Sequence, residues 1–222
     1  MPDCDISNEE ASEKYYNCNT CDTKLKCKQK LHFVIQFLKF SMKFLDSQVA
    51  KMELELSNLI ENCDYNDAEK LHQILDDHKD KYHAQHYLIL ILKWWIINIY
   101  GRQKGYHYPL LNSKLIQDKI EFCTDYLKAM DIIDPGLSHN RGRSLWELYS
   151  VLAYQLSQEW NEQKVSKSQF KTRIQSLIPI LEETIRCLTY YDSEGTLEYQ
   201  VCKMAAKALV NTKETLSFID LM

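Results

Sequence analysis

The chain has 222 residues, of which 45% are hydrophobic and 26% charged, an ordinary composition for one packed domain with or without a small appendage. Five glycines and four prolines are too few for a turn-rich sandwich or barrel, so long helices with short loops are favoured. The formal net charge of −4 excludes a molecule that attracts nucleic acid as a whole.

Charge is unevenly distributed along the first third of the chain. Residues 24–43 carry six lysines and no acid, whereas residues 53–81 carry nine acids and three lysines. We interpret both runs as solvated helix faces. Binding of the basic run to nucleic acid or to a membrane surface is the alternative.

Residues 1–28 differ from the rest because they are polar and show no helical stripe. They contain four of the eight cysteines: Cys4, Cys18, Cys21 and Cys27. The N-terminus lacks the features of a secretory signal, so we expect an intracellular protein of the cytoplasm or nucleus, with reduced thiols. The other four cysteines fall within helical patterns and are predicted to lie in or near the core.

The first of these cysteine groups raises the question of a metal. Cys18 and Cys21 form a C-x-x-C pair, which offers two thiolates to zinc from one tight turn, and Cys4 and Cys27 are weaker candidates for the remaining ligands. A C-x-x-C turn that binds no metal is the alternative. Redox catalysis by this pair requires a strand–helix context that the sequence lacks.

From residue 29 onward the hydrophobic periodicity predicts helices in succession. The first spans about 30–62, with a break near residues 46–47. The second begins at about Asn66, whose side chain is predicted to cap it, and ends near residue 82. The third, 83–100, is apolar on nearly every face and stops at Gly101. Its core of about 14 residues is roughly 21 Å long, which is too short to span a bilayer. We therefore predict a central helix that is packed on several sides, with Trp94 and Trp95 buried.

Four further helices follow. Ser113 is predicted to cap the fourth, which ends at residues 134–136. The fifth runs to about residue 162 and places Trp146 on a buried stripe. The sixth contains Pro179, which is expected to kink or split it, and Gly195 precedes the seventh. The sequence therefore predicts an all-α protein with about seven antiparallel helices in a tetratricopeptide-like superhelical array.

Four stretches, taken in order, are similar to the C-terminal region of arthropod-type SET and MYND domain proteins, a family of protein-lysine methyltransferases. They are HAQHYL at 83–88, YGRQKGY at 100–106, IIDPGLSHNRG at 132–142 and LWEL at 145–148. The pattern of residues 169–209 is similar as well. Gln85, Asn140, Trp146, Tyr149 and Pro179 depart from the family pattern.

The resemblance implies two parts, a remnant of a post-SET zinc ribbon at 1–28 and a helical C-terminal domain at 29–222. In this family the first half of the ribbon precedes the pair formed by Cys18 and Cys21, so we expect the chain to be a shortened form of a longer protein. The implied partners are a SET catalytic lobe or other proteins, with no nucleic acid and no membrane.

None of the motifs of a SET active site occurs in the sequence, so no catalytic or S-adenosylmethionine-binding residue is assigned, and that cofactor is expected only in a full-length parent. We therefore predict a helical binding or regulatory domain without activity of its own. An independent tetratricopeptide-like adaptor is the second hypothesis. A small zinc enzyme that uses the cysteines and the histidines His83 and His86, with His78 nearby, is the third. The resemblance, however, gives His83 and His86 a structural role at a helix start.

Overall fold

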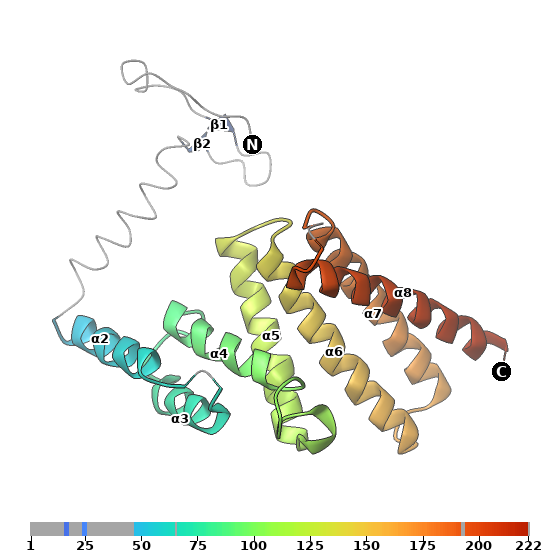
Figure 1. The fold of residues 1–222 in the computed structure, drawn as a ribbon, viewed down its shortest axis with the longest axis horizontal. Helices are drawn as coiled ribbons and strands as arrows, with labels where there is room; N and C mark the ends of the chain where they lie inside the picture. The colour runs from blue at the N-terminus through green and yellow to red at the C-terminus, as the bar shows by residue number, and fades with distance from the viewer. Residues whose placement is uncertain (1–15, 18–23, 26–46, 65, 192–193, 222) are drawn as a thin grey trace. The chain divides into compact units, whose positions relative to one another are not determined.

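The computed structural model describes residues 16–17, 24–25, 47–64, 66–191 and 194–221 (Figure 1). The chain divides into two units, Met1–Asn58 and Leu59–Met222. In the first unit, β1 (Tyr16–Asn17) and β2 (Lys24–Leu25) form a minimal antiparallel pair. The cysteines of the predicted zinc segment, Cys4, Cys18, Cys21 and Cys27, lie outside the described residues, so zinc binding stays a prediction.

Apart from that pair of strands, the regular secondary structure of the described residues is helical, which confirms the prediction of an all-α protein with about seven helices. The helices are α2 (Ser47–Glu61), α3 (Ala68–His78), α4 (Tyr87–Ile99), α5 (Ser113–Ile133), α6 (His139–Asn161), α7 (Lys167–Leu188) and α8 (Leu197–Leu221), with a 3-10 turn, η1 (Tyr108–Leu110), before α5.

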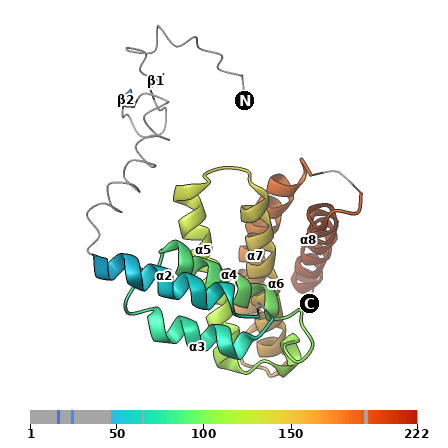
Figure 2. The ribbon, with the colours of Figure 1, turned by 60° about the vertical axis from the view of Figure 1, so that its left-hand side comes forward.

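Within the second unit each helix packs on the next one along the chain, from α3 to α8, mostly in antiparallel pairs. Both views show α8 on the outer side of α7, at the opposite end of the unit from α3 (Figures 1 and 2). Short connections between long amphipathic helices produce this order, because a helix that reverses direction within a few residues must lie beside its predecessor. None of the described helices combines the length and apolarity needed to span a bilayer.

Helix α4 is the most enclosed helix near the start of the unit. Leu92, Ile96 and Ile97 have no exposed surface, as expected for a helix that is apolar on nearly every face. The tryptophans are less enclosed than predicted, because Trp94 and Trp95 are only partly buried, as is Trp146 on α6. The Trp94 ring instead lies at the helix surface, with its centroid 4.8 Å from that of Tyr126 and 5.3 Å from the Arg143 guanidinium carbon.

Three helix starts differ from the predictions by one to four residues. Asp67, and not Asn66, caps α3 by accepting a hydrogen bond from the Lys70 amide at 3.0 Å. Asn112, and not Ser113, caps α5. Helix α4 begins at Tyr87, since the residues from His83 form a turn before it. At the starts of α3 and α5 two adjacent polar residues are able to cap, and the path of the preceding loop selects between them.

The last three helices share two apolar clusters. One contains Leu145, Cys187, Leu188 and Val201, and the other Leu156, Ile174, Leu177 and Ile219. Of the two effects predicted for Pro179, the split does not occur, because α7 is continuous from Lys167 to Leu188, and the kink stays a prediction. Proline lacks an amide hydrogen, so the Gln175 carbonyl loses its donor within the helix. Pro179 and Gln175 are both exposed, so water can bind this carbonyl instead.

Candidate functional site

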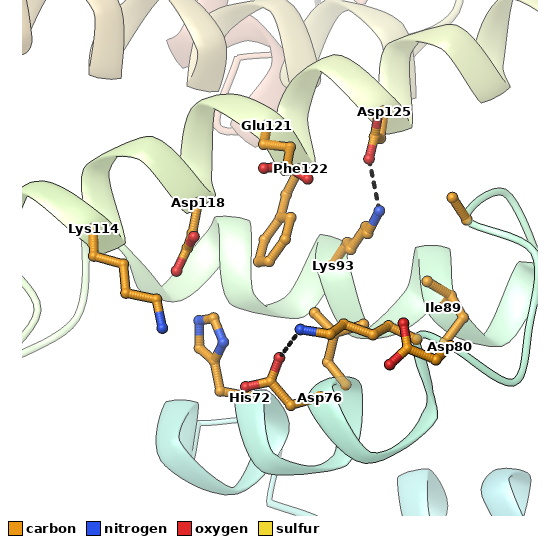
Figure 3. Close-up of a pocket in the computed structure, with 13 residues that line it drawn as sticks. His72, Asp76, Asp80, Ile89, Lys93, Lys114, Asp118, Glu121, Phe122 and Asp125 are labelled. Atoms are coloured by element: carbon orange, nitrogen blue, oxygen red, sulfur yellow. Dashed lines mark hydrogen bonds and ion pairs between the residues drawn. The ribbon is translucent and has the colours of Figure 1, made fainter.

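A cavity of about 350 Å³ opens among α3, α4 and α5, and we call it the α3–α5 cavity (Figure 3). It lies wholly within the second unit of the chain. The residues that line it are His72, Leu75, Asp76, Lys79, Asp80, Ala84, Ile89, Lys93, Lys114, Asp118, Glu121, Phe122 and Asp125. Most of them are charged, so the cavity differs from the apolar clusters elsewhere in the unit.

Helical spacing brings these side chains to one place. On α3, His72, Asp76 and Lys79 follow at intervals of four and three residues and therefore share a face. Helix α5 repeats the arrangement from Lys114 through Asp118 to Asp125. Helix α4, between them in sequence, contributes Ile89 and Lys93, one turn apart. The close-up shows side chains of all three helices converging on the same space (Figure 3).

Two ion pairs inside the lining neutralise part of its charge. The Lys93 ammonium is 2.7 Å from the Asp125 carboxylate and 5.5 Å from the centre of the Phe122 ring. Lys93 is buried, so this pair has low solvent screening. Lys79 pairs with Asp76 at 2.8 Å on the exposed surface of α3, and the hydrogen bond from Lys79 lowers the pKa of Asp76.

Three carboxylates of the lining have no such pair. Asp80, Asp118 and Glu121 make no ion pair with another described residue. The five carboxylates of the lining face three ammonium groups, which leaves an excess of two negative charges when His72 is neutral. The α3–α5 cavity is therefore acidic, and its excess charge lies beside α5.

His72 is the uncharged polar group of the cavity. Its ring lies 5.7 Å from that of Tyr100 and 5.8 Å from that of Phe122. Its Nε2 atom is buried and has no hydrogen-bond partner among the described residues. Burial lowers the pKa of His72 despite the opposing effect of Asp118 and Asp76, and Lys114 and Lys79 act in the same direction as burial. The imidazole is consequently neutral at pH 7.

This environment predicts a pH dependence of stability. The pKa of His72 in the folded chain lies below the ordinary value of 6.5, so the unfolded chain takes up the proton first as the pH falls. The free energy of unfolding should therefore fall as the pH drops below about 6.5 and level off below the folded pKa. We expect His72→Phe, which keeps a ring between Tyr100 and Phe122, to show a shallower decline between pH 7.5 and 5 in urea titrations. His107→Phe, which removes an exposed imidazole, should retain the wild-type slope; equal slopes in all three proteins would contradict this prediction.

A second charged cluster joins the end of α4 to α5 and α6, and its central pair, Lys119 and Glu147, is buried. Lys119 has no exposed surface; its ammonium lies 2.7 Å from the Glu147 carboxylate and also donates to the Tyr100 carbonyl. Arg102 binds the other oxygen of Glu147. With the Tyr108 ring centre 5.2 Å from the Lys119 ammonium, little space remains for a ligand, and we interpret this cluster as structural.

An apolar groove of about 250 Å³ lies among α6, α7 and α8. Trp160 and Phe170 of its lining stack with ring centroids 4.3 Å apart. Polar lining residues include Ser157 of α6 and Asn211, Thr212 and Thr215 of α8. Helical arrays of the tetratricopeptide kind bind peptides in grooves of this type.

The histidines considered as metal ligands do not converge on a metal. His78 Nδ1 is 2.8 Å from the Ile74 carbonyl, and His83 Nδ1 accepts from the Gln85 amide at 3.2 Å. His86 packs against the Tyr82 ring, with centroids 4.8 Å apart. No group of three or more His, Cys, Asp or Glu residues within the described ranges is arranged to hold a metal ion.

Three of the four cysteines predicted to lie within helices do so: Cys123 and Cys187 are buried, and Cys202 is partly buried. Cys63 instead follows the end of α2 and is partly buried. Burial raises the pKa of the Cys123 thiol to about 12, so a thiolate nucleophile at this position is excluded at neutral pH.

Neither the protein families nor the curated proteins compared with this chain give a match. The similarity to SET and MYND proteins therefore stays a resemblance. Sequence reasoning had also missed the α3–α5 cavity, although the spacing of charged residues on the polar faces of α3 and α5 was a visible signal. Their convergence depends on the packing of both helices about α4.

Proposed function

We propose that this chain is a helical protein-binding domain of the SET and MYND type, which contributes binding and regulation but no catalytic residue to a protein-lysine methyltransferase-like protein. One observation carries the proposal. Two of the four stretches behind the resemblance contact each other through Arg102 and Glu147, and a third binds α7 through Arg141 and Glu183.

The loop after α4 contains the YGRQKGY stretch, residues 100–106. Gly101 adopts a positive φ of 87°, and its amide donates to the Tyr106 carbonyl at 2.7 Å. An added Cβ at Gly101 would lie 2.5 Å from the Tyr108 ring, so the turn requires glycine both for its backbone and for its space. The turn delivers Arg102 to Glu147, a residue of the LWEL stretch.

The connection from α5 to α6 contains the IIDPGLSHNRG stretch, residues 132–142. Ser138 caps α6, and Arg141 binds both Asp131 at the end of α5 and Glu183 on α7, the latter at 2.7 Å. The Arg141 side chain therefore links α5, α6 and α7. Residues with such roles are those that a domain of one family would share, which supports the proposal over a chance similarity of helical patterns.

An independent tetratricopeptide-like adaptor is the second candidate, and the apolar groove among α6, α7 and α8 favours it. The coding sequence upstream of the Met1 codon distinguishes the two candidates. SET motifs there, together with binding of the encoded catalytic lobe to this chain, support the first candidate; an upstream sequence without them supports the adaptor.

The first candidate also predicts an outcome for the isolated chain. Because no SET motif occurs in residues 1–222, we expect no heat of binding on titration with S-adenosylmethionine and no transfer of labelled methyl groups to a core-histone mixture. A micromolar site for the cofactor in the calorimeter would contradict a non-catalytic role. Zinc bound by Cys18 and Cys21, with Cys4 and Cys27, is part of the same proposal and is measured by metal analysis of the purified chain.

A further inference from the structure

We propose that the α3–α5 cavity receives a lysine or arginine side chain from a basic segment of a partner protein. The inference rests on the protein-binding function proposed above and names the chemistry of the partner. Its volume of about 350 Å³ is near the lower end of the roughly 300–1,000 Å³ range of small-molecule sites, so it suits one long side chain better than a cofactor.

Charge is the first argument. Asp76 and Asp125 are already paired with lysines, whereas Asp80, Asp118 and Glu121 are not paired with any described residue. An incoming ammonium or guanidinium group would balance this excess, and a phosphate or carboxylate would increase the repulsion. The charge therefore favours a basic protein segment over nucleic acid.

The cavity already contains an example of the interaction. Lys93 lies between the Asp125 carboxylate and the face of Phe122, which combines an ion pair with a cation–π contact. Glu121, directly before Phe122, and Asp118, one turn before it, bring further carboxylates to the same helix (Figure 3). A second cation near Asp118 and Glu121 would contact carboxylates and the Phe122 ring, as Lys93 does.

His72 supplies an observation that is independent of the carboxylates. Its buried Nε2 has no hydrogen-bond partner among the described residues, and a buried polar atom without a partner costs about 1–3 kcal/mol. In the tautomer with the proton on Nδ1, Nε2 accepts a hydrogen bond. A lysine or arginine N–H would satisfy it, whereas a metal ion lacks a sufficient set of ligands there.

Lys114 is the competitor for this position. It is exposed and, with Asp118, extends from α5 toward His72 (Figure 3). Its ammonium group repels an incoming cation and offers the carboxylates an internal counter-ion. The arrangement therefore makes two predictions of opposite sign, weaker binding when Asp118 and Glu121 are neutralised and tighter binding when Lys114 is neutralised.

The test uses the full chain and a fluorescein-labelled peptide of sequence Gly-Ser-Lys-Arg-Lys-Ser-Gly, with Gly-Ser-Glu-Gln-Glu-Ser-Gly as the acidic probe. In anisotropy titrations, Asp118→Asn with Glu121→Gln should weaken binding of the basic peptide at least about tenfold, and Lys114→Gln should tighten it. The matched control is Glu69→Gln with Asp77→Asn, which removes two exposed charges of α3 outside the cavity and should change binding less than about threefold. Circular dichroism shows whether each variant is folded.

Resonances of the His72 ring give a second readout, because a cation in the cavity shifts them and a distant charge does not. The proposal fails if the basic peptide does not bind, if both double variants weaken it equally, or if it leaves the His72 resonances unchanged. It also fails if the acidic peptide binds as tightly. Any of these results, together with binding of an upstream SET lobe, would remove the cavity from the explanation and leave the proposed function standing.

Discussion

Replacing Glu147 with leucine should lower the free energy of unfolding by about 3–5 kcal/mol, the usual cost of breaking a buried ion pair from one side. The substitution leaves the Lys119 ammonium enclosed, with the Tyr100 carbonyl as its remaining hydrogen-bond acceptor among the described residues. For a chain of this size the change corresponds to a decrease of roughly 6–20 °C in melting temperature. Urea titration followed by circular dichroism measures it directly.

The double variant Lys119→Met with Glu147→Leu separates the cost of the stranded charge from the value of the pair. Apolar side chains of similar size fill the same space, so most of the lost stability should return. Arg102 also loses its partner, but its side chain is 37% exposed and water replaces the carboxylate. The exposed pair of Lys213 and Glu182, 3.1 Å apart, serves as control, and Glu182→Leu should cost less than about 1 kcal/mol. A loss below 1 kcal/mol for Glu147→Leu would contradict the structural role of the cluster.

Helix positions were largely predictable from the sequence because burial repeats with the helical period. Leu145 and Leu156 of α6 pack against residues of α7 and α8, and Gly101 and Gly195 separate the helices they were predicted to separate. The caps were less predictable, since Asp67 and Asn66 carry equally suitable side chains and only the backbone path distinguishes them.

The burial of polar residues could not be predicted from the apolar stripe of a single helix. Glu147 lies off the apolar stripe of α6, yet it is 2% exposed, because α6 packs against α5 as well as against α7. Lys119 lies among apolar residues of α5, and its charge alone would have placed it in solvent. The acidic cavity was not predicted for the same reason. Its side chains come from three helices, and the hydrophobic periodicity of each helix does not show how the three pack together.

Gly142 illustrates how packing reverses a local preference. A glycine inside a helix costs about 1 kcal/mol relative to alanine, so Gly142→Ala would stabilise an isolated α6. In the folded chain an added Cβ would lie 2.6 Å from Leu188 Cγ and 2.9 Å from the Cβ of Cys187. Both neighbours have no exposed surface, and the Cβ of Cys187 moves only with the backbone of α7. Accommodating the methyl group therefore requires α6 and α7 to separate.

We expect Gly142→Ala to destabilise the protein by about 1–2 kcal/mol, since overpacking typically costs about 1–3 kcal/mol and the gain in helix propensity offsets only part of it. The matched comparison is Gln158→Gly against Gln158→Ala at an exposed position of the same helix, where alanine should be the more stable by about 1 kcal/mol. The sign of the glycine-to-alanine difference should therefore reverse between positions 158 and 142 in urea titrations. Alanine favoured at both positions would mean that α6 and α7 are not in the close contact that Gly142 permits, and the role given to the Arg141–Gly142 segment in the proposed family resemblance would lose its physical basis.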